Sequence, residues 1–116
     1  MSEFRILRFF GRSYEDLVAF PRQVYAEAGR QLKDVQYGRE PSDWKPMKSI
    51  GQGVNELRLR DASGAYRVIY IAKFSEAVYV LHCFEKKTQK TSRADLDLAT
   101  ARYRALIRGR IHVHRS

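Results

Sequence analysis

Arginine, histidine and aromatic side chains recur in three strand-like segments near the middle of the chain, VNELRLRD (54–61), AYRVIYIAKF (65–74) and AVYVLHCFEK (77–86). The guanidinium of arginine presents a planar fork of donors that fits the oxygens of a phosphate. Histidine titrates near neutral pH and can accept or donate a proton, and an aromatic ring can stack on a nucleobase. If they meet in one place, these residue types suit the binding and cleavage of a phosphodiester.

Whether they meet depends on strand register, which the short links between the segments constrain. The links Ala62-Ser63-Gly64 and Ser75-Glu76 predict antiparallel hairpins, because a parallel pair needs a much longer connection. The predicted pairs are Arg60 with Ala65, Arg58 with Arg67, Leu57 with Val68, Phe74 with Ala77, Ile69 with His82 and Arg67 with Phe84.

The register also assigns each side chain to a face, because successive residues of a strand point to opposite sides of the sheet. The face predicted to lie under helices carries Leu57, Leu59, Tyr66, Val68, Tyr70, Leu81 and Cys83. The opposite face carries Glu56, Arg58, Arg67, Ile69, His82, Phe84 and Lys86. The second face therefore gathers cations, a histidine and an aromatic ring.

Arg58 opposite Arg67 is an unfavourable arrangement unless something compensates the two positive charges. A bound anion would do so, and so would Glu56 and Glu85 as counter-charges. The simpler alternative is that both arginines extend into solvent and Glu56 neutralises one of them. A histidine and an aromatic ring on the same face favour the anion site.

The segment FEKKTQKT (84–91) continues directly from this face. Its lysines could contact phosphates as point charges, and its threonines could donate hydroxyl hydrogen bonds. The alternative is a solvated link between a strand and a helix, which most basic runs are.

Four other side chains that could bind or react have simpler interpretations. The alternating pattern around Cys83 predicts a buried thiol, whereas a reactive thiolate needs an electropositive, partly exposed site. Trp44 is expected to pack its loop onto the core, with base stacking as the alternative. His112 and His114 have the spacing of metal ligands but no cysteine or carboxylate companions, so no metal is assigned to them.

The elements that must position these residues follow from periodicity and from helix and turn signals. We expect a first strand at 4–10, a helix starting near Ser13, a helix at 22–37 that stops at Gly38, and a last helix from Ser92 or Arg93 to about Arg108. Pro21 is expected to kink the first helix or to open the second.

Prolines and glycines predict a loop at 38–53. Residues 1–110 are expected to form one domain and residues 111–116 a flexible basic tail.

Composition narrows the class of protein. The 116 residues fit one domain, and 44% hydrophobic residues are enough for a modest core. Lys and Arg number 22 against 13 Asp and Glu, a net charge of +9, which favours nucleic acid over an acidic protein or an anionic membrane as partner. No apolar run approaches the roughly 18 residues of a membrane-spanning helix, and we expect no signal peptide. A single cysteine suits a cytoplasmic location.

The chain resembles the HigB-like, phage-associated branch of the RelE/ParE toxin superfamily. The matching pieces are WKPMKSIGQGVNELRLRD (44–61), GAYRVIY (64–70) and VLHCFEKKTQKT (80–91), followed by a helix that carries Arg102-Tyr103. With the order of elements, the likeness covers most of residues 3–108. The resemblance implies a RelE-like α+β fold: a twisted antiparallel β-sheet of about four strands, with N-terminal helices packed on one face and a C-terminal helix.

The resemblance also implies a function and partners. It implies a toxin that cleaves mRNA in the ribosomal A site, paired with a cognate antitoxin that is often a helix-turn-helix protein. Members of the wider superfamily instead poison DNA gyrase, and fold alone does not separate these activities. A non-enzymatic module whose basic face docks an acidic partner is a third hypothesis.

Metal-independent RNA cleavage needs a base for the 2′-hydroxyl, cations for the phosphate and an acid for the leaving oxygen. The candidate catalytic residues are Arg67, His82 and Arg58, and the candidate RNA- or phosphate-binding residues are Arg60, Phe84, Lys86, Lys87 and Lys90. Some relatives use a tyrosine near the C-terminus as base, but Tyr103 is not taken as its equivalent, so the base stays open. The sequence contains no glycine-rich phosphate loop or nucleophile elbow, and no cofactor is expected.

Overall fold

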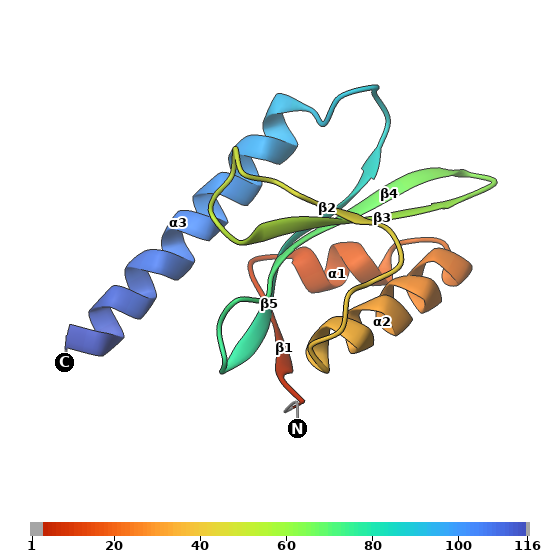
Figure 1. Cartoon of the computed structure of the whole chain (residues 1–116). Helices are drawn as coiled ribbons and strands as arrows, with labels where there is room; N and C mark the ends of the chain where they lie inside the picture. The colour runs from red at the N-terminus through yellow and green to blue at the C-terminus, as the bar shows by residue number, and fades with distance from the viewer. Residues whose placement is uncertain (1–3, 116) are drawn as a thin grey trace.

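The structure is a computed structural model that describes the backbone of residues 4–115 and the side chains of residues 4–110. Five strands form one sheet in the order β1-β5-β4-β3-β2 (Figure 1). They are β1 (Ile6–Phe9), β2 (Trp44–Pro46), β3 (Val54–Asp61), β4 (Gly64–Ile71) and β5 (Ala77–Lys86). This confirms the α+β class, with two helices between β1 and β2 and one helix after β5.

The sheet differs from the predicted one at both edges. β1 pairs in parallel with the first half of β5, so the sheet is mixed and has five strands instead of about four antiparallel ones. The second difference is β2, which lies inside the predicted loop and pairs with β3. Its three residues include Pro46 at the sheet edge, where the missing N–H of a proline is tolerated. A strand this short and proline-containing leaves almost no periodic signal.

Three helices flank the sheet, α1 (Ser13–Val18), α2 (Arg22–Gln36) and α3 (Arg93–Arg115). Pro21 is the N-cap of α2, and its carbonyl oxygen accepts the first helical hydrogen bond, from the N–H of Tyr25 at 2.9 Å. Of the two alternatives, Pro21 therefore opens the second helix, from the position just before its first turn, and does not kink the first. Gly38 follows α2 with a φ of 80°, the left-handed conformation that ends many helices. α3 runs to Arg115 and includes most of the predicted tail; the side chains of residues 111–116 lie outside the described part.

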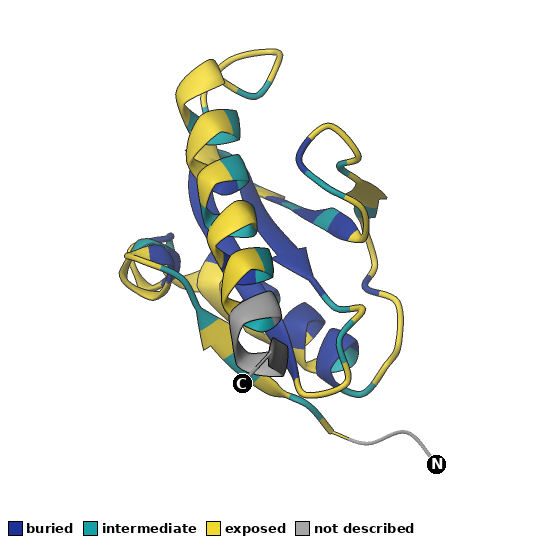
Figure 2. Cartoon of the chain, turned by 90° about the vertical axis from the view of Figure 1, so that its left-hand side faces the viewer, coloured by how far each residue is buried: buried dark blue, intermediate teal, exposed yellow. Residues whose placement is uncertain are grey.

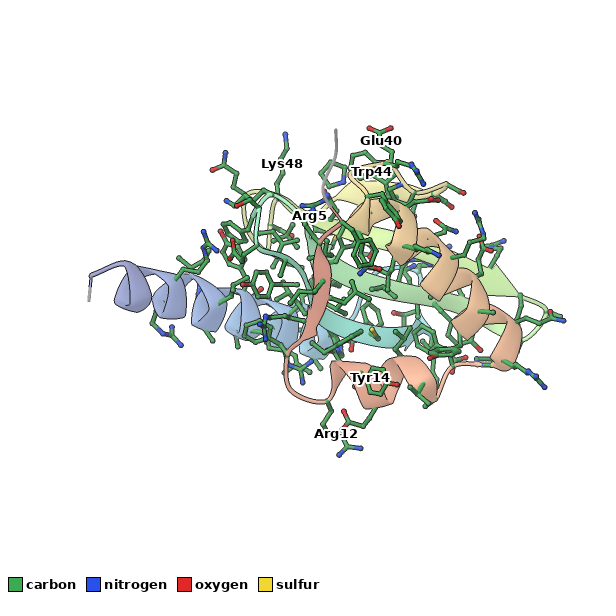
Figure 3. All side chains as sticks on the ribbon, turned by 90° about the horizontal axis from the view of Figure 1, so that it is seen from below. Arg5, Arg12, Tyr14, Glu40, Trp44 and Lys48 are labelled. Carbon is green, nitrogen blue, oxygen red and sulfur yellow. The ribbon has the colours of Figure 1, made fainter. Side chains whose placement is uncertain are left out.

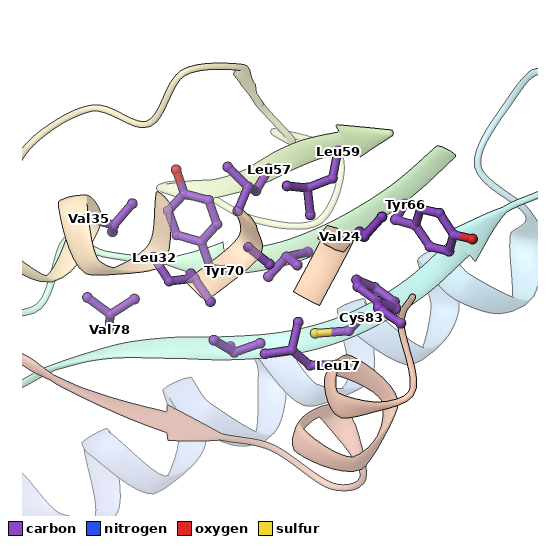
Figure 4. Close-up of a cluster of buried hydrophobic side chains, with 14 residues drawn as sticks. Leu17, Val24, Leu32, Val35, Leu57, Leu59, Tyr66, Tyr70, Val78 and Cys83 are labelled. Atoms are coloured by element: carbon purple, nitrogen blue, oxygen red, sulfur yellow. The ribbon is translucent and has the colours of Figure 1, made fainter. Parts of the chain in front are cut away.

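Helices cover both faces of the sheet. α1 and α2 pack on the face that carries Leu57, Val68 and Cys83, and together they form the first core (Figure 4). α3 runs across the opposite face, where the strands behind it are buried (Figure 2). The second face is therefore apolar where α3 covers it, and only its remaining part is available for chemistry.

The predicted register is confirmed over most of the two hairpins. Arg58 pairs with Arg67, Leu57 with Val68, Arg60 with Ala65, Ile69 with His82, and Arg67 with Phe84. A β-bulge then shifts β5 by one residue, so that Tyr70 pairs with Val80 and Ile71 with Tyr79.

The bulge overturns two predictions. The pair of Phe74 with Ala77 does not form, because the ladder ends at Ile71. Leu81 is the extra residue of β5, and it packs in the second core with α3 instead of facing α1 and α2. The other residues predicted for the helix-covered face lie in the first core.

Candidate functional site

A small cavity opens at the end of the second face that α3 leaves uncovered. Its volume is about 220 Å³, and it lies between β3, β4 and the residue that precedes β2. The lining residues are Asp43, Arg58, Leu59, Arg60 and Arg67, and we call it the arginine cavity. Three of the predicted site residues thus meet in one place.

The β3–β4 hairpin fixes where these arginines stand. Arg58 and Arg67 are directly opposed across the two strands, and two pairs lie between them and the pair that closes the hairpin. At the turn, the Asp61 carboxylate accepts hydrogen bonds from the backbone N–H of Ser63 at 2.8 Å and from its hydroxyl at 2.6 Å. A turn held in this way sets the register, and the register sets which arginines face one another.

Glu56 compensates the charges of the opposed arginines. Its side chain is 2% exposed, and its Oε1 atom lies 3.5 Å from Nε of Arg58 and 3.6 Å from Nε of Arg67. One buried carboxylate therefore serves both guanidinium groups, whereas the sequence left open an anion, two carboxylates or extension into solvent. Glu85 is not a partner, because it pairs with Tyr66 and belongs to the opposite side of the sheet.

The two arginines differ in exposure. The Arg67 side chain is 8% exposed and its Nη1 atom donates to the backbone oxygen of Tyr66 at 3.0 Å, while Arg58 is 37% exposed. Burial lowers the pKa of Arg67 from its ordinary value, the charge of Arg58 lowers it further, and Glu56 opposes both effects. An arginine stays protonated despite such a shift, so Arg67 is a largely desolvated cation beside a more accessible one.

His82 is close to this site in register but is not part of its lining. The residue is 5% exposed, and its Nε2 atom lies 2.7 Å from Oδ1 of Asp95 in the first turn of α3. Its ring stacks on Phe84, with ring centres 4.9 Å apart and planes 23° apart. The Nδ1 atom is buried without a hydrogen-bond partner in the described part of the chain. His82 therefore links the sheet to α3.

Phe84 connects the histidine with the arginines, since it stacks on His82 and pairs across the strands with Arg67. It also lines a second cavity of about 190 Å³ at the start of the β5–α3 loop, together with Glu85, Lys86, Lys87, Thr88, Ser92 and Asp95. Lys90 lies exposed in the same loop. The predicted binding residues thus form a strip from the arginine cavity to the start of α3, in which Phe84 is buried and the lysines lie at the surface.

Two carboxylates of this region were missed by the sequence reasoning. Asp95 is held by Ser92, whose hydroxyl donates to its Oδ2 atom at 2.7 Å and accepts from its backbone N–H at 3.1 Å. The spacing Ser92-x-x-Asp95 is a capping-box pattern, so the helix start was readable, but its contact with His82 was not. No sequence pattern indicates the position of Asp43. It lies at the cavity because its backbone carbonyl oxygen accepts a hydrogen bond from the backbone N–H of Arg58 at 2.9 Å.

Several other candidates lie away from the arginine cavity. Cys83 is buried in the first core, and burial raises the pKa of its thiol far above the ordinary value, which confirms the inert thiol. Trp44 is half-buried in β2 near Glu40, at another edge of the molecule (Figure 3), where it lines a separate cavity of about 210 Å³. Tyr103 packs in the second core. The side chains of His112 and His114 lie outside the described residues.

Neither a metal site nor a membrane-spanning helix is found among the described residues. No group of three histidine, cysteine, aspartate or glutamate side chains among them is arranged to hold a metal ion. No helix within the same range has the length and apolarity needed to cross a membrane.

Comparison with known proteins places the chain in a family. The family model described as "Phage derived protein Gp49-like (DUF891)" matches residues 15–104, which include most of α1, all of α2, every strand except β1 and half of α3. No curated protein matches the chain. The fold and the extent of this match show that the chain belongs to the phage-derived Gp49-like family, a member of the RelE/ParE toxin-like group.

Proposed function

We propose that the protein is the toxin of a type II toxin–antitoxin system, of the HigB-like branch, and that it is a metal-independent endoribonuclease that cleaves mRNA on the ribosome. The observation that carries this proposal is the arginine cavity, where Arg58 and Arg67 share one carboxylate and still face open space. A guanidinium pair of which one member is largely desolvated is suited to stabilise the charge that develops on a phosphate during cleavage.

In this proposal each part of the strip has a role. Arg58 and Arg67 bind the oxygens of the scissile phosphate, and Arg60 contacts the neighbouring phosphate of the RNA. Phe84 is buried against His82, so it would have to become exposed before it could stack beside a base, while Lys86, Lys87 and Lys90 contact flanking phosphates.

His82 is the proposed proton-transfer residue and also the least accessible member of the set. Because it is buried and bonded to Asp95, taking a proton from RNA would require the first turn of α3 to move away from it. The alternative role that its contacts support is to hold Phe84 and α3 in place.

The proposed partners are mRNA on the ribosome and a cognate antitoxin, a helix-turn-helix protein in this proposal. Both would be met in the cytoplasm. The net charge of +9 supports a polyanionic target such as mRNA with ribosomal RNA around it.

The test is a cell-free translation reaction in which the 5′ ends of mRNA are mapped after addition of the purified protein. We expect cuts in register with codons, present only with ribosomes. Arg67→Ala should abolish them while the protein remains folded, and His82→Ala measures the contribution of the histidine. Arg22→Ala is the matched control, because Arg22 is exposed at the start of α2 on the other side of the sheet.

Each alternative activity predicts intact mRNA in this assay and a different result in a second measurement. A gyrase-poisoning toxin would leave mRNA intact and translation normal, and would instead trap cleaved DNA on purified gyrase. A non-enzymatic module would cut neither nucleic acid and would show only salt-sensitive binding. Intact mRNA with full translation would therefore contradict the ribonuclease proposal.

A further inference from the structure

Glu56 is the most deeply buried charged side chain of the second face, with 2% of its surface exposed. Burying a carboxylate is unfavourable unless cations and hydrogen bonds compensate it. Here the compensation comes from Arg58 and Arg67, whose Nε atoms lie at almost the same distance from a single oxygen, 3.5 and 3.6 Å from Oε1. The three residues form one ionic unit that spans β3 and β4.

The arrangement determines which edges of the two guanidinium groups remain for a ligand. Both Nε atoms are turned to the Glu56 side, are buried and make no hydrogen bond in the described part of the chain. Both arginines also line the arginine cavity. Without a shared anion between them, two opposed cations would repel each other and separate.

We propose that Glu56 is a positioning residue that holds Arg58 and Arg67 as a pair aimed at one phosphodiester group. This inference rests on the proposed function. The charges of the site support it, because three guanidinium groups stand against two carboxylates, Glu56 and Asp43. One positive charge remains uncompensated, which matches the single negative charge of a phosphodiester.

The first arm of the test measures the contact of Glu56 with the two arginines by NMR and does not depend on enzymatic activity. The ¹H–¹⁵N signals of arginine Nε–H groups are recorded for the wild-type protein and assigned with Arg58→Lys and Arg67→Lys. We expect two Nε–H groups that exchange slowly with water. Glu56→Gln, or Glu56→Asp if the glutamine variant does not fold, should speed the exchange of both at least tenfold. Unchanged exchange of both groups in a folded variant would overturn the inference.

The second arm measures cleavage of mRNA in the ribosome assay. Glu56→Asp keeps the negative charge, but its side chain is one methylene shorter, so the carboxylate lies farther from the two arginines. We expect kcat to fall by roughly 10- to 100-fold, because small misplacements at a reacting centre have effects of this size. KM should stay within about threefold, since the cations that attract RNA remain. Asp34→Asn is the matched control, because Asp34 is a carboxylate of α2 whose partners are Arg30 and Arg39.

The two arms separate a failure of this inference from a failure of the proposed function. If the Glu56→Asp variant folds and its kcat equals that of the wild-type protein, cleavage needs only the negative charge at position 56 and not its placement. That result would overturn the positioning role. Absence of cleavage by the wild-type protein, together with slow Nε–H exchange that depends on Glu56, would reject the ribonuclease and leave a prearranged anion site.

Discussion

Cys83 and Tyr70 are two titratable side chains of the first core whose neutral forms are favoured by burial. Burial raises the pKa of Tyr70 to about 12 and raises that of the Cys83 thiol still further from its ordinary value. Unfolding returns both groups to their ordinary pKa values, so the unfolded chain releases their protons at lower pH than the folded protein does. The stability they support at neutral pH is therefore lost as pH rises.

We expect the free energy of unfolding in urea to fall progressively between about pH 9 and pH 12. Tyr70→Phe removes one of the two ionisations and should flatten the curve at its alkaline end. A wild-type curve with no decline over this range would contradict the assignment.

The buried thiol gives an independent check at pH 8. Cys83 should not react with a thiol-specific reagent in the folded protein and should react completely once the chain is unfolded. Reaction of the native protein at the rate of a free thiol would contradict its burial.

At the level of elements, the hairpins were predictable because short turns leave little freedom in register. The pair of Arg58 with Arg67 follows from the spacing of the β3–β4 turn alone, whereas the pair of Arg67 with Phe84 also depends on the bulge between it and the β4–β5 turn. The bulge that moved Leu81 was not predictable, because its stabilisation comes from α3: the side chain packs in the second core, and Arg102 donates to the Leu81 carbonyl oxygen at 2.8 Å. Contacts between distant segments leave no local pattern.

The start of α3 depends on Ser92, which caps the helix. Ser92→Ala removes both hydrogen bonds and should lower the free energy of unfolding by about 1 kcal/mol, measured by urea denaturation. Ser75→Ala in the β4–β5 turn is the control, since Ser75 is exposed and outside every helix. Equal effects of the two changes would show that Ser92 has no capping role.

Two glycines should respond in opposite ways to the same substitution. A Cβ added at Gly51 would overlap the ring of Tyr103, so Gly51→Ala should destabilise the protein by about 1–3 kcal/mol by displacing the ring or the loop. At Gly29, inside α2, a Cβ meets nothing within 4 Å. Gly29→Ala should therefore stabilise the protein by roughly 0.5–1 kcal/mol. Thermal unfolding of both variants tests the packing of α3 on the β2–β3 loop.

At the level of the whole molecule, positive charge should dominate any binding to RNA. Affinity for a short RNA should fall steeply as salt rises, and replacing one phosphate-contacting residue should reduce the slope of log affinity against log salt by about one. Lys87→Gln is the variant for this measurement, because Lys87 is exposed beside the cavity at the β5–α3 loop. A slope equal to that of the wild type would remove Lys87 from the interface.

The candidate site was predictable to the extent that it lies within one hairpin. Arg58, Arg60 and Arg67 meet as expected because β3 and β4 are adjacent in the chain. His82 was assigned to the correct face, but its burial depends on Asp95, thirteen residues away in a helix whose docking no local pattern encodes. Periodicity therefore identifies the face of a sheet that carries charge, while tertiary packing decides how much of that face solvent reaches.

The parallel pairing of β1 with β5 has a consequence for the order in which the chain folds. Ile6 and Ala77 are partners although about seventy residues separate them, whereas β3, β4 and β5 are joined by short turns. Contacts between distant residues close large loops and form slowly, so the meander should assemble first and β1 should dock last. Until then Val78 and Val80 have an unpaired strand edge beside them, a template for pairing with another chain. During synthesis, the intermediate most prone to aggregation should therefore be one in which the arginine hairpin is already complete and the first strand is still free.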